Sequence, residues 1–476
     1  MWQEFLYNFI IYIIFTYSVI TLGFYLFIGV YSIGETRRYL NKSSFTDHSL
    51  LASSPYAPSI SILAPAFNEE LTVVQNVRSL LSIYYNQLEL IVINDGSTDD
   101  SLHKLIIAYD MEPASHLYYQ HIPTRLVKCI YKSRNPVYHK LILIDKENGG
   151  KSDALNAGIN VADSRYLVCI DVDCILEQDA LVKLISPFLQ TGEAPVIATG
   201  GVVRIANSCI VENGRLTEIN LPRKFLPRTQ ALEYIRAFLL GRMAWSRLNG
   251  LLLISGAFGA FDRNIVIKAG GYNTKTVGED MELLVRMRRY MEEHKLPYKV
   301  TYIPDPLCWT EVPDTYKILG KQRNRWARGT LETLKLHRVM FFNPRYGLLG
   351  MLSYPYWFFF EFLGPIVEFL GFVAFIIFII LGMVDWPFFL ALLAFIYTLG
   401  FLFSLFAILM ETYTYNQYKK KGDLTQLILT AFVEPLLFHP FIIWSAVRGD
   451  IDFLRKKKSW GDMERKGFAT KLETNS

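Results

Sequence analysis

The feature that most constrains this chain is an uncharged stretch near its start, Phe5–Gly34. A helix needs about 20 apolar residues to cross a bilayer, so the stretch predicts a transmembrane helix over residues 5–34. A cleavable signal peptide is the alternative, but residues 1–4 contain no Lys or Arg and no small-residue cleavage site closes the stretch. Arg37, Arg38 and Lys42 follow it. The positive-inside rule therefore puts the N-terminus outside and the chain from residue 40 onward in the cytoplasm.

Apolar stretches return after residue 345. Basic clusters at Lys419–Lys421 and Arg455–Lys458 both favour the cytoplasm. The last apolar run must then enter and leave on one side, and Pro435 and Pro440 could break it into a re-entrant hairpin. The alternative is a fourth C-terminal crossing. We predict an interfacial or membrane segment, two transmembrane helices, a re-entrant or transmembrane segment and a cytoplasmic tail, at residues 346–364, 365–384, 387–411, 424–447 and 448–476 respectively.

Composition agrees with an integral membrane protein that carries a large soluble domain. Hydrophobic residues make up 51% of the chain and charged residues 20%, which argues against both a wholly soluble and a wholly membrane-embedded protein. Lys and Arg number 49 against 44 Asp and Glu, and the resulting net charge of +5 predicts no nucleic-acid partner. The five cysteines show no C-x-x-C spacing, so we expect neither a zinc site nor a redox pair.

The predicted soluble domain, residues 55–345, mixes short β-branched runs with helical patterns. Helical patterns separate several of the runs, which predicts an α/β domain with a mostly parallel sheet. Residues 102–134 are long for a crossover and indicate an insertion. The strand candidates are Ser59–Pro65, Leu88–Asn94, Lys140–Asp145 and Tyr166–Asp171.

Two polar motifs follow the first two predicted strands. Ligands in parallel α/β sheets bind at the carboxyl ends of strands, so the position favours a site. The first motif, Ala64–Glu70, is APAFNEE, and the second, Asn94–Asp100, is NDGSTDD. For the second motif alone, a turn followed by a capped helix is the favoured interpretation.

Two further motifs stand at the carboxyl ends of the third and fourth predicted strands. Asn148–Asn156 combines two glycines, which permit close backbone approach, with Lys151, which could pair with a phosphate. The G-x-x-x-x-G-K-S spacing is missing, so a P-loop is not predicted. Asp171 and Asp173 stand at the end of the fourth strand, and paired carboxylates suit Mg²⁺ or Mn²⁺ held jointly with a diphosphate.

These four motifs, in this order, resemble family 2 glycosyltransferases with a GT-A fold. Three further matches strengthen the resemblance: Ser255–Phe261 (SGAFGAF), Gly278–Asp280 (GED) and Gln322–Trp326 (QRNRW). The last is the Q-x-x-R-W motif of processive membrane synthases, a group that includes cellulose, hyaluronan and poly-N-acetylglucosamine synthases. The chain resembles that group over nearly its whole length.

The resemblance implies a nucleotide-sugar site at the first motifs. Asn68 or Glu69, together with Asp95, would contact the uracil and ribose. Lys151 would approach the nucleotide, and Asp171 would border it. The donor would be a UDP-sugar, with UDP-N-acetylglucosamine the leading candidate by domain layout.

The resemblance also implies the catalytic groups. Asp280 would be the general base, taking the proton of the acceptor hydroxyl as that oxygen attacks the anomeric carbon with inversion. Asp173 would bind Mg²⁺ or Mn²⁺, and Arg325 would help that ion offset charge on the departing diphosphate. The acceptor contacts would be Trp326, Phe258 and Glu279, with the Trp326 indole stacked on a sugar face.

Plainer interpretations of these residues remain open. Glu279 and Asp280 could be the acidic first turn of a helix, and Trp326 could be an interfacial anchor. Phe258 is of a type more often found in a core. Gly278 stands where the family commonly has Thr, so a hydroxyl contact is missing. Residues 459–467 resemble the tail of hyaluronan-type synthases, and no β-rich sensor domain like that of regulated cellulose synthases follows.

The predicted function is an inverting, metal-dependent glycosyltransferase of the inner membrane. It would be multi-pass, with its catalytic domain in the cytoplasm, and would extend a β-linked polysaccharide and pass it across the bilayer. Its partners would be the UDP-sugar donor, the growing glycan acceptor and the lipid bilayer, with any export partner proteins unknown. The alternatives are a non-processive transferase that adds one sugar to a lipid carrier, and a nucleotide-binding transport or scaffold protein without catalysis.

Overall fold

A computed structural model describes residues 2–43, 48–115, 118–190, 192, 194–212 and 214–457. Lys458 and the predicted tail motif lie outside the described residues. The chain divides into two compact units. The helical unit contains the chain up to Thr36, Arg223–Arg247 and the chain from Pro313 onward, and the sheet unit contains Arg37–Pro222 and Leu248–Val312. The predicted soluble domain was continuous, whereas two of its segments, 223–247 and 313–345, belong to the helical unit.

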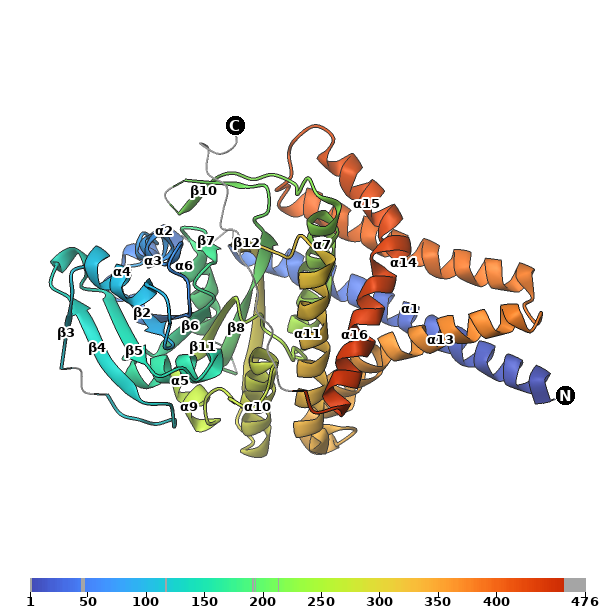
Figure 1. The fold of residues 1–476 in the computed structure, drawn as a ribbon, viewed down its shortest axis with the longest axis horizontal. Coiled ribbons are helices and arrows are strands. Elements are labelled where there is room, and N and C mark those ends of the chain that lie inside the picture. The colour runs from blue at the N-terminus through green and yellow to red at the C-terminus, as the bar shows by residue number, and fades with distance from the viewer. Residues whose placement is uncertain are drawn as a thin grey trace. The chain divides into compact units, whose positions relative to one another are not determined.

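The sheet unit is built on a ten-stranded sheet of order β3-β4-β5-β2-β1-β6-β11-β8-β12-β7 (Figure 1). A separate two-stranded sheet pairs β9 with β10. The strands are β1 Ile60–Ala66, β2 Leu88–Asn94, β3 Met111–Pro113, β4 Val127–Ser133, β5 Leu141–Lys146, β6 Tyr166–Ile170, β7 Ile175–Leu176, β8 Val196–Ile205, β9 Ile210–Glu212, β10 Arg215–Glu218, β11 Phe258–Asp262 and β12 Lys299–Thr310.

The four predicted strands are β1, β2, β5 and β6, and they run parallel to one another. Their alignment brings Ala66 opposite Asn94, and Asn94 opposite Asp145. The predicted motifs therefore leave the sheet on the same side, at the carboxyl ends of these strands. The sheet as a whole is mixed, because β4 and β11 run antiparallel to their neighbours. The insertion predicted at residues 102–134 supplies β3 and β4 at the sheet's edge.

Helices pack against this sheet and position the motif loops. Gly158 of α5 faces Leu63 and Ile93, where a Cβ would lie 3.1 Å from a side-chain atom of each, so α5 sits close on β1 and β2. The helices of the sheet unit are α2 His48–Ser53, α3 Val73–Leu81, α4 Ser101–Ala108, α5 Lys151–Val161, α6 Ala180–Ile185, α9 Arg263–Lys268 and α10 Glu279–Glu293, with short 3₁₀ turns at Pro136–Tyr138 and Ser186–Leu189.

The helical unit holds the long apolar helices. Its helices are α1 Trp2–Ser43, α7 Phe225–Ile235, α8 Met243–Arg247, α11 Tyr316–Leu336, α12 Tyr354–Tyr356, α13 Leu363–Ile380, α14 Trp386–Thr414, α15 Asp423–Leu437 and α16 His439–Leu454. Arg236–Arg242, Leu349–Ser353 and Trp357–Phe362 are π-helical, and Arg338–Met340 and Pro344–Tyr346 are 3₁₀ turns.

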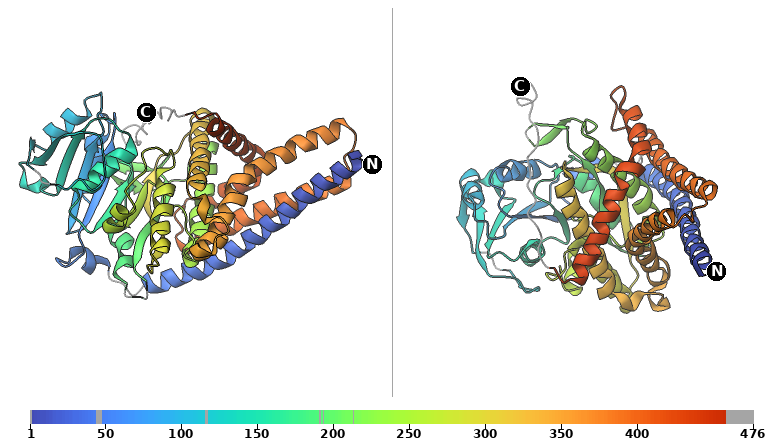
Figure 2. Two further views of the ribbon diagram at one scale, coloured as in Figure 1. Left: turned by 90° about the horizontal axis from the view of Figure 1, so that it is seen from below. Right: turned by 45° about the vertical axis from the view of Figure 1, so that its right-hand side comes forward.

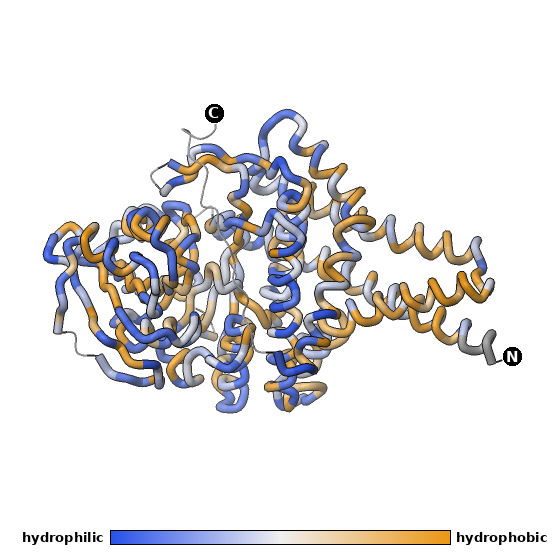
Figure 3. The backbone as a smooth tube through the Cα atoms, in the orientation of Figure 1, coloured by the Kyte–Doolittle hydropathy of each residue, from blue (hydrophilic) through white to orange (hydrophobic). Residues whose placement is uncertain are grey.

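Within the described residues, three helices are long and apolar enough to cross a membrane: Tyr7–Ser43, Leu349–Ile380 and Trp386–Thr414. The hydropathy colouring shows α1, α13 and α14 as mostly hydrophobic (Figure 3). α15 and α16 pass the same test only as a pair, bent by 49°. The break falls at Phe438, between Pro435 inside α15 and Pro440 at the start of α16, where the sequence predicted an interruption.

α1 runs beside α13 and α14, as two views agree (Figure 2). The Tyr7 ring lies 4.9 Å from Phe378 near the end of α13, and Tyr25 stacks on Phe403 of α14 at 4.8 Å. The backbone N–H of Asp385, in the loop that joins α13 to α14, donates to the Tyr7 hydroxyl. The start of α1 and this loop therefore share one end of the bundle.

Candidate active site

The first two predicted motifs hold each other at the edge of the sheet. Asn68 has a left-handed backbone (φ 55°), and its side-chain oxygen accepts from the Thr98 N–H at 2.8 Å. The Glu69 N–H donates to Ser101 Oγ at 2.9 Å. Asp99 accepts from the Ser101 N–H, which agrees with the expected turn, but the N-cap residue of α4, Asp100, makes no side-chain cap hydrogen bond. Part of the second motif is therefore structural.

Asp95, predicted as a nucleotide contact, is instead enclosed in a buried cluster with Lys146 and Asp153. Lys146 Nζ lies 2.6 Å from Asp95 Oδ1 and 2.6 Å from Asp153 Oδ2. The side chains of Lys146, Asp95 and Asp153 are only 0%, 4% and 8% exposed. Asp95 also accepts from the N–H groups of Gly149 (3.0 Å) and Gly150 (2.7 Å). Its visible role is to hold the glycine loop against the strand ends.

Close approach requires glycine at Gly96, in the second motif, and at Gly149, in this loop. A Cβ at Gly96 (φ 67°) would lie 2.6 Å from the Asn148 nitrogen, and one at Gly149 would lie 2.4 Å from Asp153 Oδ2. Lys146 was not among the predicted site residues. Its position in the sequence could have indicated a role. Lys146 stands at the end of an apolar strand and just before the glycine loop, where a cation would be close to the acidic residues of the neighbouring motifs.

Lys151 begins α5 and points into a group of carboxylates. Its Nζ lies 2.5 Å from Asp171 Oδ1 and 3.9 Å from Glu279 Oε1. Burial lowers the pKa of the Lys151 ammonium, but the attraction of Asp171 and Glu279 outweighs burial, so the net pKa is raised above its ordinary value. Lys151 therefore stays charged at neutral pH and can attract an anionic ligand.

Asp280, the predicted base, lies in the same group. Its Oδ2 accepts from the Gly256 N–H at 3.0 Å, and its Oδ1 accepts from the Met281 N–H at 2.8 Å. A Cβ at Gly256 would lie 3.3 Å from Lys151 Nζ and 3.4 Å from Asp280 Cβ. The tertiary fold thus brings the third, fifth and sixth motifs together, at one edge of the sheet unit. Asp280 also lies in the first turn of α10, as the helix-end interpretation expected, and its catalytic role stays a prediction.

Asp171, Asp173 and Cys174 could hold a metal ion, since their ligand atoms lie within 4.8 Å of one another. A hydrogen bond with Cys308 and burial raise the pKa of the Cys174 thiol well above its ordinary value, so the thiol stays protonated. Two carboxylates then remain as donors, and hard oxygen ligands fit Mg²⁺ or Mn²⁺. The residues present therefore fit the predicted ion.

The structure corrects the prediction for Phe258. Its side chain is 0% exposed in β11, and a Cβ at Gly201 would lie 2.4 Å from its ring. A ring packed against a glycine of β8 cannot reach an acceptor without opening the core. Phe258 is a core residue. It belongs to a strand that is buried on both faces, so its side chain points into the core although the residue is part of the motif.

Arg325 and Trp326 lie on α11 in the helical unit. Within that unit, the neighbouring Arg323 binds Glu233 of α7 through both terminal nitrogens, at 2.8 and 2.6 Å. The Arg323 guanidinium also covers the Trp326 ring at 4.2 Å, and Trp326 is 40% exposed. The indole is therefore braced from one side with free surface remaining, as a stacking platform requires.

Comparison with known families agrees with this site. Residues 61–113 match the profile described as glycosyl transferase family 2, and residues 134–329 match that of glycosyltransferase-like family 2. A chitin synthase profile matches residues 260–429. All the predicted site residues fall inside the two family 2 matches. The chain therefore contains a family 2 glycosyltransferase domain, and its α/β sheet is the arrangement expected of the GT-A class.

Curated relatives include poly-β-1,6-N-acetyl-D-glucosamine synthases. One from Staphylococcus epidermidis is 29% identical over 65% of this chain and 64% of its own length. One from Staphylococcus aureus strain COL is 30% identical over 58% of this chain and 55% of its own length. The chain thus spans less than two thirds of the relatives it matches. Among solved structures, a Pyrobaculum calidifontis mannosyltransferase in complex with GDP-Man and Mn²⁺ is similar at a TM-score of 0.49, with 14% identity over 90% of this chain and 100% of that one.

Proposed function

We propose that this protein is an inverting glycosyltransferase that extends a β-linked polysaccharide from a UDP-sugar, with UDP-N-acetylglucosamine as the donor. The observation that carries the proposal is that Lys151 lies near Asp171 and Glu279, while Gly256 lies against both Lys151 and Asp280. The similarity to poly-N-acetylglucosamine synthases supports the donor and the polymeric product.

The chemistry of the group suits transfer from a sugar diphosphate. Asp280 is an intermediate-exposed carboxylate at a helix start, able to accept the proton of an acceptor hydroxyl within hydrogen-bond reach. Lys151 presents a permanent positive charge for the diphosphate, and Asp171 keeps that ammonium oriented. Asn68, Glu69 and Asp95 remain proposed for the nucleoside. Asp95 could reach it only if the glycine loop opened, since its carboxylate is occupied.

Metal dependence is part of the proposal. Asp173 and Asp171 would hold Mg²⁺ or Mn²⁺, which would supply positive charge opposite the leaving diphosphate. Lys151 faces several carboxylates here, so additional cationic charge would help a diphosphate to bind. Arg325 and Trp326 are proposed, on the motif alone, for the diphosphate and the acceptor.

We also propose a multi-pass inner-membrane protein whose sheet unit is cytoplasmic. The contact between Tyr7 and Asp385 puts the start of α1 and the α13–α14 loop at one end of the bundle. The opposite ends carry Arg37 and Arg38 near the end of α1 and lead to Lys419–Lys421 after α14, and the positive-inside rule assigns both basic groups to the cytoplasm. Passage of the product through the helical unit is proposed as well.

The test is sugar transfer by the purified full-length protein, with a panel of radiolabelled UDP-sugars and divalent cation. We expect a long polymer from UDP-N-acetylglucosamine that linkage-specific hydrolases degrade. Asp280→Asn should lower turnover by about 10²–10⁴-fold while UDP affinity stays near wild type, because the amide keeps the shape but cannot accept the proton.

Each alternative predicts a different result. Transfer of a single sugar to a lipid would favour the non-processive transferase. Nucleotide binding without transfer from any UDP-sugar would favour a transport or scaffold protein. Unchanged turnover in Asp280→Asn would remove the base assignment.

A further inference from the structure

Two buried asparagines of α5 hold the backbone of neighbouring segments. The Asn156 side chain donates from Nδ2 to the Tyr272 carbonyl oxygen at 2.9 Å, and its Oδ1 accepts from the Tyr272 N–H at 2.7 Å. One turn further along α5, Asn160 makes the same pair of hydrogen bonds with Ile122, at 2.8 and 3.0 Å. The two asparagines are 1% and 2% exposed, so water does not compete for these bonds.

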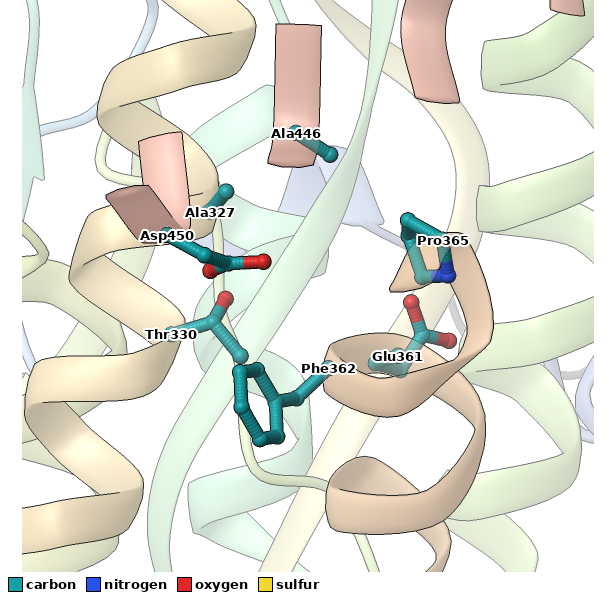
Figure 4. Close-up of a pocket in the computed structure, with 7 residues that line it drawn as sticks. All are labelled: Ala327, Thr330, Glu361, Phe362, Pro365, Ala446 and Asp450. Atoms are coloured by element: carbon teal, nitrogen blue, oxygen red, sulfur yellow. The ribbon is translucent and has the colours of Figure 1, made fainter. Parts of the chain in front are cut away.

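The paired amide of Asn156 differs from another buried polar side chain of the protein. In the helical unit, Asp450 lines a small pocket with Thr330 and Glu361 (Figure 4), and its buried Oδ1 accepts no hydrogen bond from any described residue. An oxygen without a partner loses no bond when its side chain shifts. Asn156 cannot shift without breaking two buried hydrogen bonds, so it fixes the backbone of Tyr272.

The segment that Asn156 holds, residues 269–272, is also bound by α10. Arg286 of α10 donates to the carbonyl oxygens of Ala269 at 3.1 Å and Gly271 at 2.5 Å. Gly271 has a left-handed backbone (φ 70°), and a Cβ there would lie 2.6 Å from Asn156 Oδ1. The segment is therefore a tightly packed joint between α5 and α10.

These two helices begin with the groups proposed for catalysis. Lys151 is the first residue of α5, and Asp280 is the second residue of α10. Asn156 follows Lys151 by five residues and Arg286 follows Asp280 by six. At a rise of about 1.5 Å per residue, these separations are about 7.5 and about 9 Å along the helices. The joint therefore connects the two helices at similar distances from Lys151 and Asp280.

The side chain of Tyr272 extends from this joint toward the carboxylates of α10. Burial raises the pKa of its hydroxyl most, contact with the Cys169 thiol raises it further, and the negative charges of Glu279 and Asp280 add to the shift. The hydroxyl therefore lies within electrostatic reach of both carboxylates. Tyr272 is 5% exposed, so a displacement of this ring would disturb the packing next to the proposed base.

We propose that Asn156 and Arg286 are positioning residues, which set the place of Asp280 relative to Lys151 by holding residues 269–272 between α5 and α10. The inference rests on the proposed function, because it takes Asp280 as the base. Without the Asn156 amide, α10 should shift while Lys151 keeps its place at the start of α5. Turnover should then fall without a loss of UDP affinity, since a misplacement of about 1 Å can cost about 100-fold in rate.

The test is a double-mutant cycle of sugar transfer by the purified full-length protein, with UDP-N-acetylglucosamine and divalent cation. Asn156→Ala should lower kcat by about 10- to 100-fold and leave the Kd for UDP, measured by calorimetry, within about twofold. In the Asp280→Asn background, the same substitution should lower kcat by less than about twofold, because no base remains to be positioned.

Asn160→Ala is the matched control. It removes the same pair of hydrogen bonds from the same helix at nearly the same burial, so it should lower Tm by a similar amount. It should nevertheless keep kcat within about twofold of wild type, since both hydrogen bonds of Tyr272 stay in place. A fall in kcat as large as that of Asn156→Ala would contradict the proposal.

The cycle separates this inference from the proposed function. An equal fall in kcat in both backgrounds would make Asn156 a merely structural residue and would overturn the inference alone. Unchanged turnover in Asp280→Asn would remove the base assignment and the inference with it. If Asn156→Ala does not fold, Arg286→Gln loosens the same segment from α10, at a side chain that is 25% exposed. It should show the same non-additive pattern, and an additive result there would also overturn the inference.

Discussion

Replacing Lys146 by methionine is the sharpest test of how the active-site loops are held. The substitution keeps the buried aliphatic stem but removes the ammonium that lies 2.6 Å from both Asp95 and Asp153. Two carboxylates would then share a site in which neither is more than 8% exposed. Removing one partner of a buried pair costs about 3–5 kcal/mol, because the remaining charge is left uncompensated. Here two charges are left, so we expect a loss at the upper end of that range.

The charges of the cluster predict that Asp153→Asn destabilises the protein less than Lys146→Met does. The intact cluster carries one positive and two negative charges, so Asp153→Asn leaves a neutral Lys146–Asp95 pair. That variant should cost only about 1–3 kcal/mol, the usual loss for a hydrogen bond to a charged group. The double variant Lys146→Met with Asp153→Asn should be more stable than Lys146→Met alone, since it removes one of the two orphaned carboxylates.

The assay is thermal unfolding of the full-length protein, paired with the KM for the donor. A loss of 3–5 kcal/mol in a unit of this size corresponds to a fall in Tm of roughly 6–20 °C. Loosening of the Gly149–Gly150 loop should raise the donor KM more than it lowers kcat. If Asp153→Asn were as destabilising as Lys146→Met, or if the double variant were the least stable of the three, the argument from buried charge would be refuted.

Two further substitutions test the neighbouring geometry. Asp173→Ala should abolish the dependence of UDP binding on Mg²⁺ or Mn²⁺ by removing one of two carboxylate donors; calorimetry with and without EDTA measures it, and metal-dependent binding in the variant would contradict the ligand assignment. Gly149→Ala should destabilise the protein by about 1–3 kcal/mol, because its Cβ would lie 2.4 Å from Asp153 Oδ2. A wild-type Tm for that variant would show that the loop yields freely, against the packing described.

Local sequence patterns predicted a large part of this fold. The runs beginning at Ser59, Leu88, Lys140 and Tyr166 all form strands, because apolar β-branched residues bounded by turn signals leave few other structures. The proline-containing break in the last apolar run is also present, at Phe438. The second half of the sheet was not predicted. Its strands β8, β11 and β12 contain glycines and prolines that weaken the strand signal, and their pairing joins segments far apart in sequence.

For the candidate site, too, the sequence predicted some features and not others. The motifs identified Lys151, Asp171 and Asp280 as residues to watch, and the fold brings Lys151 close to Asp171 and places Gly256 between Lys151 and Asp280. The motifs could not say that Asp95 would be occupied by Lys146, or that Phe258 would be in the core. Both outcomes depend on which neighbour each side chain meets, and neighbours come from other strands.

The amino-acid order alone was enough to place the apolar helices, the parallel strands and the order of the glycosyltransferase motifs, because burial periodicity and turn chemistry act over a few consecutive residues. Tertiary packing assigned α11, with its Q-x-x-R-W motif, to the helical unit, enclosed Lys146 between two carboxylates and left Asp450 buried without a partner. The free energy of a buried charge depends on its surroundings in space, and distant segments of the chain supply those surroundings.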